Sequence, residues 1–148
     1  MSENYEQLKL ENQICFPLYA ASREVIKQYH PFLDQIGLTY TQYIAMMVLW
    51  EEKTISVKEL GRKLFLDSGT LTPLLKTLEK KGFLTRQRSR EDERILLVSL
   101  TGKGEAFKKE AAEIPFKVGQ CIKLSKEDAA NLYRILYTIL SHPDMTAT

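Results

Sequence analysis

The chain has 148 residues and a net charge of +2, with 44% hydrophobic and 27% charged residues. This length predicts one domain with a substantial core, and the composition is that of an ordinary globular protein. The longest unbroken apolar run covers residues 44–50, which is too short to cross a membrane. The polar N-terminus is not a signal peptide, and two cysteines without metal-ligand spacing predict a cytoplasmic protein without metal or cofactor.

Basic residues are concentrated in the middle of the chain. Residues 54–104 hold 11 Lys and Arg against 6 Asp and Glu, whereas the rest of the chain holds 10 against 13. A basic segment between acidic flanks is typical of a module that faces nucleic-acid phosphates. Solvated charges on any protein surface give the same pattern, so charge alone leaves both interpretations open.

The first 66 residues predict three helices. Apolar residues at helical spacing predict a helix over residues 6–35, which Pro17 interrupts and Pro31 ends or bends. A second helix is expected over residues 41–52. A third is expected to begin at Ser56, which forms a capping box with Glu59.

Residues 67–100 predict a helix followed by a β-hairpin. The helix begins at Asp67 or Ser68, carries leucines at positions 71, 74, 75 and 78, and ends at Gly82. Strands are expected over residues 84–88 and 95–100, with a charged turn between them. Helices over about 102–122 and from Ser125 onward complete the order ααααββαα. The fold class is therefore mainly α, a winged helix-turn-helix with its winged part at about 54–101.

The helix and hairpin present the side chains that a reader of duplex DNA needs. A helix enters the major groove when its exposed tip is small and hydrogen-bonding, and a wing arginine suits the minor groove. Asp92 is placed to orient Arg94 by a charge-assisted bond. The candidate DNA contacts are Ser68, Gly69, Thr70, Thr72, Pro73 and Lys76 on the helix, and Arg86, Arg88, Asp92 and Arg94 in the hairpin. Helix-turn-helix patterns also serve as protein-interaction modules, which remains the alternative.

With these residues described, a family resemblance is clear. Residues 56–101 resemble the winged helix of MarR-type regulators, whose wing carries an Asp-x-Arg signature before a hydrophobic strand, here Asp92 to Arg94. Residues 9–29, 38–51 and 65–86 resemble the organic-hydroperoxide-resistance repressors of that family. The resemblance covers most of the chain and implies one MarR-type domain over residues 1–148. It also implies a homodimer, held by helices at about 6–35 and 102–141, on double-stranded DNA.

Cys15 is the candidate for a reactive thiol. Taken alone it is most simply a small buried hydrophobe, but Tyr19 lies one helical turn away and Tyr29 and Tyr40 follow. Pro17 suits the first turn of a helix, and a helix that begins near Phe16 places Cys15 at its N-terminal end, where the dipole favours thiolate. If Pro17 only kinks a longer helix, that argument fails.

The resemblance assigns roles to these residues. It implies that Cys15 is the sensor of organic hydroperoxides and that Tyr29 and Tyr40 of the other subunit bond it. Tyr19 is a supporting candidate because of its spacing to Cys15. Oxidised Cys15 then condenses with a low-molecular-weight thiol or with a second cysteine, for which Cys121 is the candidate. Oxidation releases an inverted-repeat operator whose half-sites lie about 10 bp apart.

Three other functions fit parts of the sequence. A MarR-type regulator gated by a reversible phenolic ligand has the same fold and needs no thiol. A thiol peroxidase turns over peroxide with a reductant, which the winged helix argues against. A protein-interaction module shows no salt-dependent DNA affinity. No catalytic triad or carboxylate pair is present, so we expect no enzyme.

Overall fold

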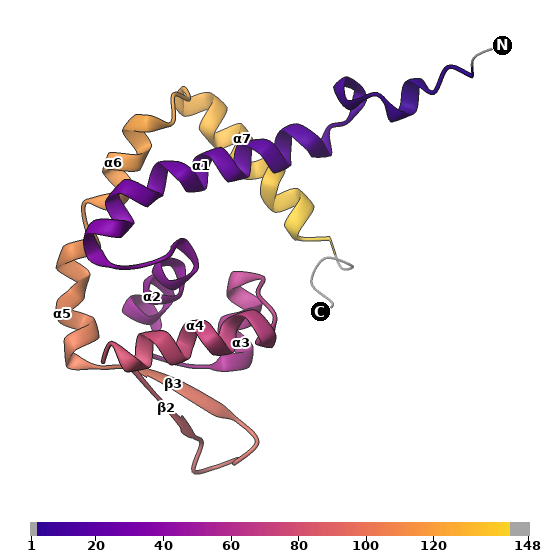
Figure 1. Ribbon diagram of the computed structural model, residues 1–148. Helices are drawn as coiled ribbons and strands as arrows, with labels where there is room; N and C mark the ends of the chain where they lie inside the picture. The colour runs from indigo at the N-terminus through magenta and orange to yellow at the C-terminus, as the bar shows by residue number, and fades with distance from the viewer. Residues whose placement is uncertain (1–2, 143–148) are drawn as a thin grey trace.

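A computed structural model describes residues 3–142. Its long first helix, α1 (Cys15–Ile36), lies across the molecule, and an N-terminal arm with two short turns, η1 (Glu6–Leu8) and η2 (Leu10–Asn12), projects beyond it (Figure 1). The sequence predicted one helix from residue 6, which is wrong. The arm carries no buried residue, so no packing holds those residues in a regular helix.

Both prolines of α1 are accommodated. Pro17 is the third helical residue, where its missing N–H has no partner to lose. Pro31 lies inside the helix, which continues to Ile36 and ends at Gly37 in the left-handed conformation (φ 70°). Of the two expectations for Pro31, that it ends the helix is therefore wrong, and that it bends the helix stays a prediction.

The helix-turn-helix part consists of α2 (Tyr40–Glu52), α3 (Val57–Leu64) and α4 (Ser68–Lys80). The side chains of Thr39, Ser56 and Asp67 cap these three helices. The predicted helices and their starts are confirmed within about one residue. The reciprocal capping box is formed by Thr39 with Gln42, whereas Ser56 only accepts from the Glu59 backbone N–H.

A three-stranded antiparallel sheet has the order β1-β3-β2. The hairpin strands β2 (Leu84–Arg88) and β3 (Leu96–Leu100) were predicted, and they form the wing that projects below α4 in Figure 1. Strand β1 (Thr54–Ser56) was not predicted. Its three residues pair with Ser99, Val98 and Leu97, so it is a strand because β3 lies beside it.

One hydrophobic core joins the winged part to the end of α1. It contains the four leucines of α4, Leu33 of α1, and Met46 and Leu49 of α2. Trp50 is also part of this core, and its indole N–H donates to the Gly104 carbonyl at 2.9 Å. This packing fixes α4 on the body while its other side faces outward.

The C-terminal region has three helices, α5 (Gly102–Ala111), α6 (Ile114–Cys121) and α7 (Lys126–Leu140). The single helix predicted over 102–122 is wrong, because Pro115 cannot donate to a carbonyl of the preceding turn. The helix predicted from Ser125 onward is confirmed, and within the single chain α7 has no buried residue. Its apolar side chains are exposed, among them Leu132, Tyr133, Ile135, Tyr137 and Ile139.

Candidate nucleic-acid interface and thiol site

Helix α4 presents a polar surface because its apolar side is fully used in the core. Leu71, Leu75 and Leu78 are at most 1% exposed. The Asp67 carboxylate caps the helix by accepting the Thr70 N–H at 2.8 Å, and this bond lowers its pKa. The outward side carries the six predicted contact residues, Ser68, Gly69, Thr70, Thr72, Pro73 and Lys76, all exposed except the half-buried Thr72. The structure therefore brings these residues together on one helical surface.

The wing holds one arginine in a fixed orientation. Asp92 accepts the Arg94 Nε and Nη2 protons at 3.0 Å each, and also the Arg94 backbone N–H at 3.1 Å. These bonds lower the pKa of Asp92 and raise that of Arg94. The Arg94 side chain is nevertheless 91% exposed, so it is oriented and still accessible.

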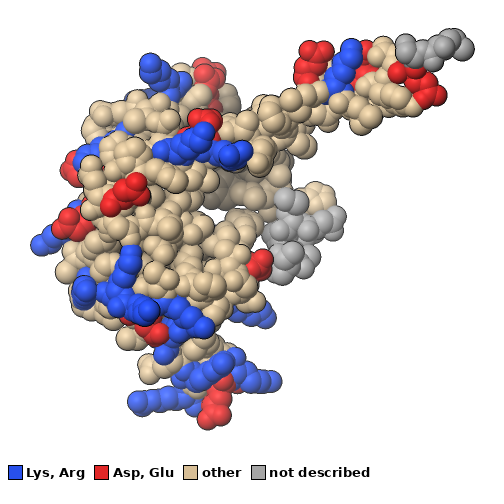
Figure 2. Space-filling view, viewed as in Figure 1, with Lys and Arg blue, Asp and Glu red and all other residues tan. Residues whose placement is uncertain are grey.

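The wing is also where positive charge gathers on the surface. Figure 2 shows Lys and Arg side chains extending from the hairpin at the bottom of the molecule, with acidic side chains between them. Arg88 lies at the end of β2, exposed, and its Nη1 donates to the Arg94 carbonyl at 3.5 Å. Arg88 and Arg94 are thus neighbours across the hairpin.

Arg86 is separated from this exposed group. Its side chain is 19% exposed and pairs with Glu79 of α4, with Nη2 and Oε1 3.1 Å apart. Sequence reasoning placed Arg86 with the DNA contacts and missed Glu79. The signal available was an acidic residue at the C-terminal end of a helix, where the dipole disfavours it.

Cys15 is the first residue of α1 and is exposed. The helix begins there, so the expectation that Pro17 belongs to its first turn is confirmed, and the thiol lies at the positive end of the dipole. Tyr19 lies one turn further and is 59% exposed. Its hydroxyl accepts from Arg23 Nη1 at 3.3 Å, and the guanidinium lies 5.5 Å from the ring centroid.

Tyr29 and Tyr40 meet far from the Cys15 of their own chain. Their ring centroids are 4.9 Å apart, and Tyr43 completes a cluster at 5.8 and 6.3 Å. Burial raises the pKa of all three hydroxyls, that of Tyr43 to about 12. Tyr43 was not predicted, although it lies one turn after Tyr40.

The distance along α1 excludes a single-chain site. Cys15 and Tyr29 are fourteen residues apart on one helix, which corresponds to about 21 Å at 1.5 Å per residue. The Tyr29 hydroxyl therefore cannot reach Cys15 of the same chain. Cys121, the last residue of α6, is exposed and free, and its Sγ lies 3.5 Å from the Lys117 carbonyl oxygen.

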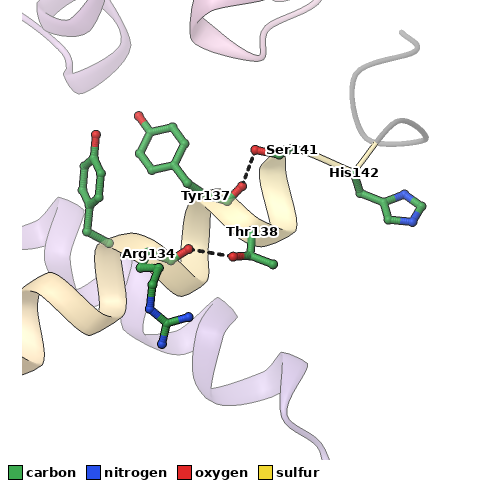
Figure 3. A pocket seen from close by; sticks show the side chains of 6 residues that line it. Arg134, Tyr137, Thr138, Ser141 and His142 are labelled. Carbon is green, nitrogen blue, oxygen red and sulfur yellow. Dashed lines mark hydrogen bonds between the residues drawn. The ribbon is translucent and has the colours of Figure 1, made fainter.

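The described residues offer neither a metal-binding cluster nor a membrane-spanning helix, and they form a hollow on the surface of α7. Residues 3–142 contain no cluster of His, Cys, Asp and Glu that could hold a metal ion, and no helix among them is long and apolar enough to span a membrane. An open hollow lies along the end of α7, lined by Tyr133, Arg134, Tyr137, Thr138, Ser141 and His142 (Figure 3). Thr138 and Ser141 donate to carbonyls of their own helix there, at 2.9 and 2.6 Å.

Comparison with known proteins shows the family of this chain. A family model described as transcriptional regulator SarA/Rot matches residues 27–111. The organic hydroperoxide resistance transcriptional regulator of Bacillus subtilis is 51% identical over 95% of both chains. The chain belongs to the MarR and SarA/Rot family of transcriptional regulators. The predicted resemblance to its organic hydroperoxide resistance members is confirmed.

Other members of this family are similar over nearly the whole chain. The regulator SarZ of Staphylococcus aureus is 43% identical over 92% of both chains. The structure of reduced AbfR bound to DNA superimposes with a TM-score of 0.75, at 36% identity over 90% of this chain and 94% of that one. The overoxidised AbfR bound to DNA gives 0.76 at 36% identity, over 93% and 96%. The winged-helix fold and the regulatory class are thereby established for this chain.

Proposed function

We propose that this chain is a cytoplasmic, homodimeric repressor that releases an inverted-repeat operator when an organic hydroperoxide oxidises Cys15. The observation that carries the proposal is the position of Cys15, exposed at the first residue of α1 in a chain 51% identical to an organic hydroperoxide resistance regulator. The alternative is gating by a small phenolic ligand, in which case Cys15→Ser would keep its response to the inducer.

In this proposal α4 enters the major groove with its N-terminal surface. Ser68, Thr70 and Thr72 offer hydroxyl groups to phosphates or base edges, and Gly69 lets the backbone come close. Pro73 adds a small apolar contact, and Lys76 reaches a phosphate or a guanine one turn further. Arg88 and Arg94 of the wing contact the neighbouring minor groove, with Asp92 orienting Arg94.

The chemistry assigned to Cys15 is a two-electron oxidation. The thiolate attacks the distal oxygen of the hydroperoxide, an S–O bond forms and the O–O bond breaks. Cys15 becomes a sulfenic acid, and the hydroperoxide is reduced to an alcohol after its alkoxide takes up a proton. The N-terminal end of α1 stabilises the thiolate, and the Tyr29 and Tyr40 hydroxyls of a second copy donate to it. Tyr19 supports the site from the same helix.

Two routes remain for the sulfenic acid. Cys121 of the second copy can condense with it to a disulfide, or a low-molecular-weight thiol can do so, with loss of water in both cases. Cys121 is free and exposed at the end of α6, which fits the first route. Mass spectrometry of wild type and Cys121→Ser after oxidation separates the routes, because only the first gives a linked dimer.

The apolar surface of the chain supports the dimer. Helix α7 has no buried residue, and Leu18 and Phe16 of α1 are also exposed. Helices from both ends of the chain therefore present apolar surface that a two-fold copy covers, and such a dimer reads half-sites about 10 bp apart.

The test is fluorescence-anisotropy binding to a duplex from the upstream region of its own gene, with and without one equivalent of an organic hydroperoxide. Wild type is expected to bind when reduced and to lose affinity at least tenfold on oxidation, whereas Cys15→Ser binds and does not respond. Cys121→Ser is expected to keep the response only when a low-molecular-weight thiol is added with the hydroperoxide. Release of Cys15→Ser by peroxide would remove the sensor role. Binding by all variants without any response would leave a DNA-binding regulator with another inducer.

A further inference from the structure

One ion pair joins α4, the helix proposed to enter the major groove, to the wing. Glu79 lies one residue before the end of α4, and Arg86 is the middle residue of β2. The turn between them passes through Gly82, whose left-handed backbone (φ 82°) turns the chain back toward the helix. As a result the carboxylate of Glu79 lies against the edge of the wing, at the base of the hairpin.

The carboxylate makes three hydrogen bonds to one residue. Oε2 accepts the Arg86 backbone N–H at 2.9 Å, and Oε1 accepts Nε at 3.3 Å and Nη2 at 3.1 Å. The backbone donor is available because β2 is an edge strand of the sheet, with its outer N–H groups unpaired by any strand. Glu79 thus binds both the backbone and the side chain of the wing strand.

The placement of Glu79 is unfavourable without this partner. A negative charge in the last turn of a helix is repelled by the dipole, and this end otherwise carries Lys80 and Lys81. The bond from the Arg86 side chain outweighs that effect and lowers the pKa of Glu79. Both side chains are partly covered, with Arg86 19% and Glu79 36% exposed.

We infer that Glu79 and Arg86 are positioning residues for DNA binding, which fix the wing relative to the recognition helix, and that Arg86 does not contact DNA. The inference rests on the proposed function, since it assumes that α4 and the wing bind the same duplex. Two elements that read neighbouring grooves bind tightly only if their relative position is set before binding. Arg88 and Arg94, further along the hairpin, then reach the backbone or the minor groove.

The salt dependence of DNA binding distinguishes a positioning role of Arg86 from a direct phosphate contact. A phosphate contact releases counterions, so its loss reduces the slope of log affinity against log salt by about 1. The Arg86 charge is neutralised locally by Glu79, so its loss should leave the slope unchanged. Removing the negative charge of Glu79 would strengthen binding if only long-range electrostatics mattered. A positioning role predicts weaker binding instead.

The experiment measures binding of reduced protein to the upstream duplex at several KCl concentrations by anisotropy. The variants are Glu79→Gln, Arg86→Gln and Arg86→Lys, with Arg88→Gln as the matched control on the same strand. We expect the three variants of the pair to bind about tenfold more weakly with the wild-type salt slope. Arg88→Gln is expected to reduce the slope by about 1. The double variant Glu79→Gln/Arg86→Gln should be no weaker than either single one.

Two controls keep the result interpretable. Stoichiometric titration gives the active fraction, which stays at the wild-type value when a variant is folded and only its affinity has changed. Arg86→Lys keeps the charge but loses the pair of side-chain hydrogen bonds from Nε and Nη2 to Glu79. Wild-type DNA affinity in this variant would therefore overturn the inference. So would a reduced slope in Arg86→Gln or tighter binding by Glu79→Gln. Absence of salt-dependent binding by the wild type would instead refute the proposed function itself.

Discussion

The Arg94 side chain is held open to solvent by a single neighbour. Asp92 accepts from the Arg94 backbone N–H and from Nε and Nη2 along one edge of the guanidinium, which restricts a side chain that otherwise has many rotamers. The Arg94 side chain is therefore already ordered in the DNA-free protein. We expect the identity of this residue to matter beyond its charge.

Substitution of Arg94 tests this expectation. Arg94→Gln should weaken DNA binding and reduce the salt slope by about 1, because a phosphate or minor-groove contact is lost. Arg94→Lys keeps the charge but cannot form the two-pronged bond to Asp92, so it should weaken binding while retaining most of the slope. Anisotropy titrations at three salt concentrations measure both quantities. A wild-type slope in Arg94→Gln would place the arginine away from the DNA.

Asp67, which caps α4, makes the stability of the protein depend on pH. The Thr70 N–H bond holds the pKa of the folded Asp67 below its ordinary value of 3.8. Its contribution to stability is therefore present above that value and is lost as the pH falls through the lower folded pKa. Asp67→Asn retains a cap that does not titrate. Its unfolding temperature should fall less steeply than that of wild type below about pH 5, and parallel curves would contradict the assignment.

At the scale of elements, the close contact of α5 with the base of the hairpin depends on Gly104. A Cβ there would lie 2.6 Å from Leu100 Cδ1 and would also collide with the Phe83 carbonyl. Its own carbonyl accepts the Trp50 indole N–H, so the helix cannot move away without losing that bond.

Gly104→Ala is expected to lower the free energy of unfolding by about 1–3 kcal/mol, as overpacking in a core does. Gly102→Ala in the same helix is the control, because nothing lies within 4 Å of the added methyl group. Urea denaturation of both variants measures the difference. Equal stability of the two would mean that α5 shifts without cost.

How far the sequence predicts these elements depends on where their stabilisation originates. Helix α4 and strand β2 were predicted within about one residue, because their leucine stripe and glycine stop are local signals. Strand β1 and the Glu79–Arg86 pair depend on partners brought close by the fold, which no local pattern contains. The break before α6 did have a local signal, Pro115, which the prediction of one helix over 102–122 did not take into account.

The candidate site divides in the same way. Cys15 at a helix start and Asp92 beside Arg94 follow from residues a few positions apart. The tyrosine cluster joins α1 to α2. Its third member, Tyr43, lies one turn after Tyr40 in the sequence, but only the structure shows that both pack against Tyr29. The roles of Cys15 and Cys121 in sensing remain predictions of the family resemblance, to be tested as described above.

At the scale of the whole molecule, α7 stands out because none of its residues is buried within the chain. Ile139 is 41% exposed in the chain alone, on the apolar stripe of a helix without buried residues. We expect Ile139→Glu to shift the protein from dimer to monomer, because it buries an unpaired charge in the interface. Sedimentation equilibrium measures the change. Thr138→Glu adds the same charge one residue earlier, outside the stripe, and should leave the dimer intact.

The uncovered α7 has a consequence for how the protein survives in a cell. If the helix is packed only in the pair, folding and association form one equilibrium, and dilution itself unfolds part of the molecule. The unfolding temperature should then rise with protein concentration. A chain that meets no partner after synthesis exposes an apolar helix to proteases and chaperones. The intracellular lifetime of a subunit would therefore depend on the concentration of its partners. Chains left without a partner would be degraded before they bind DNA.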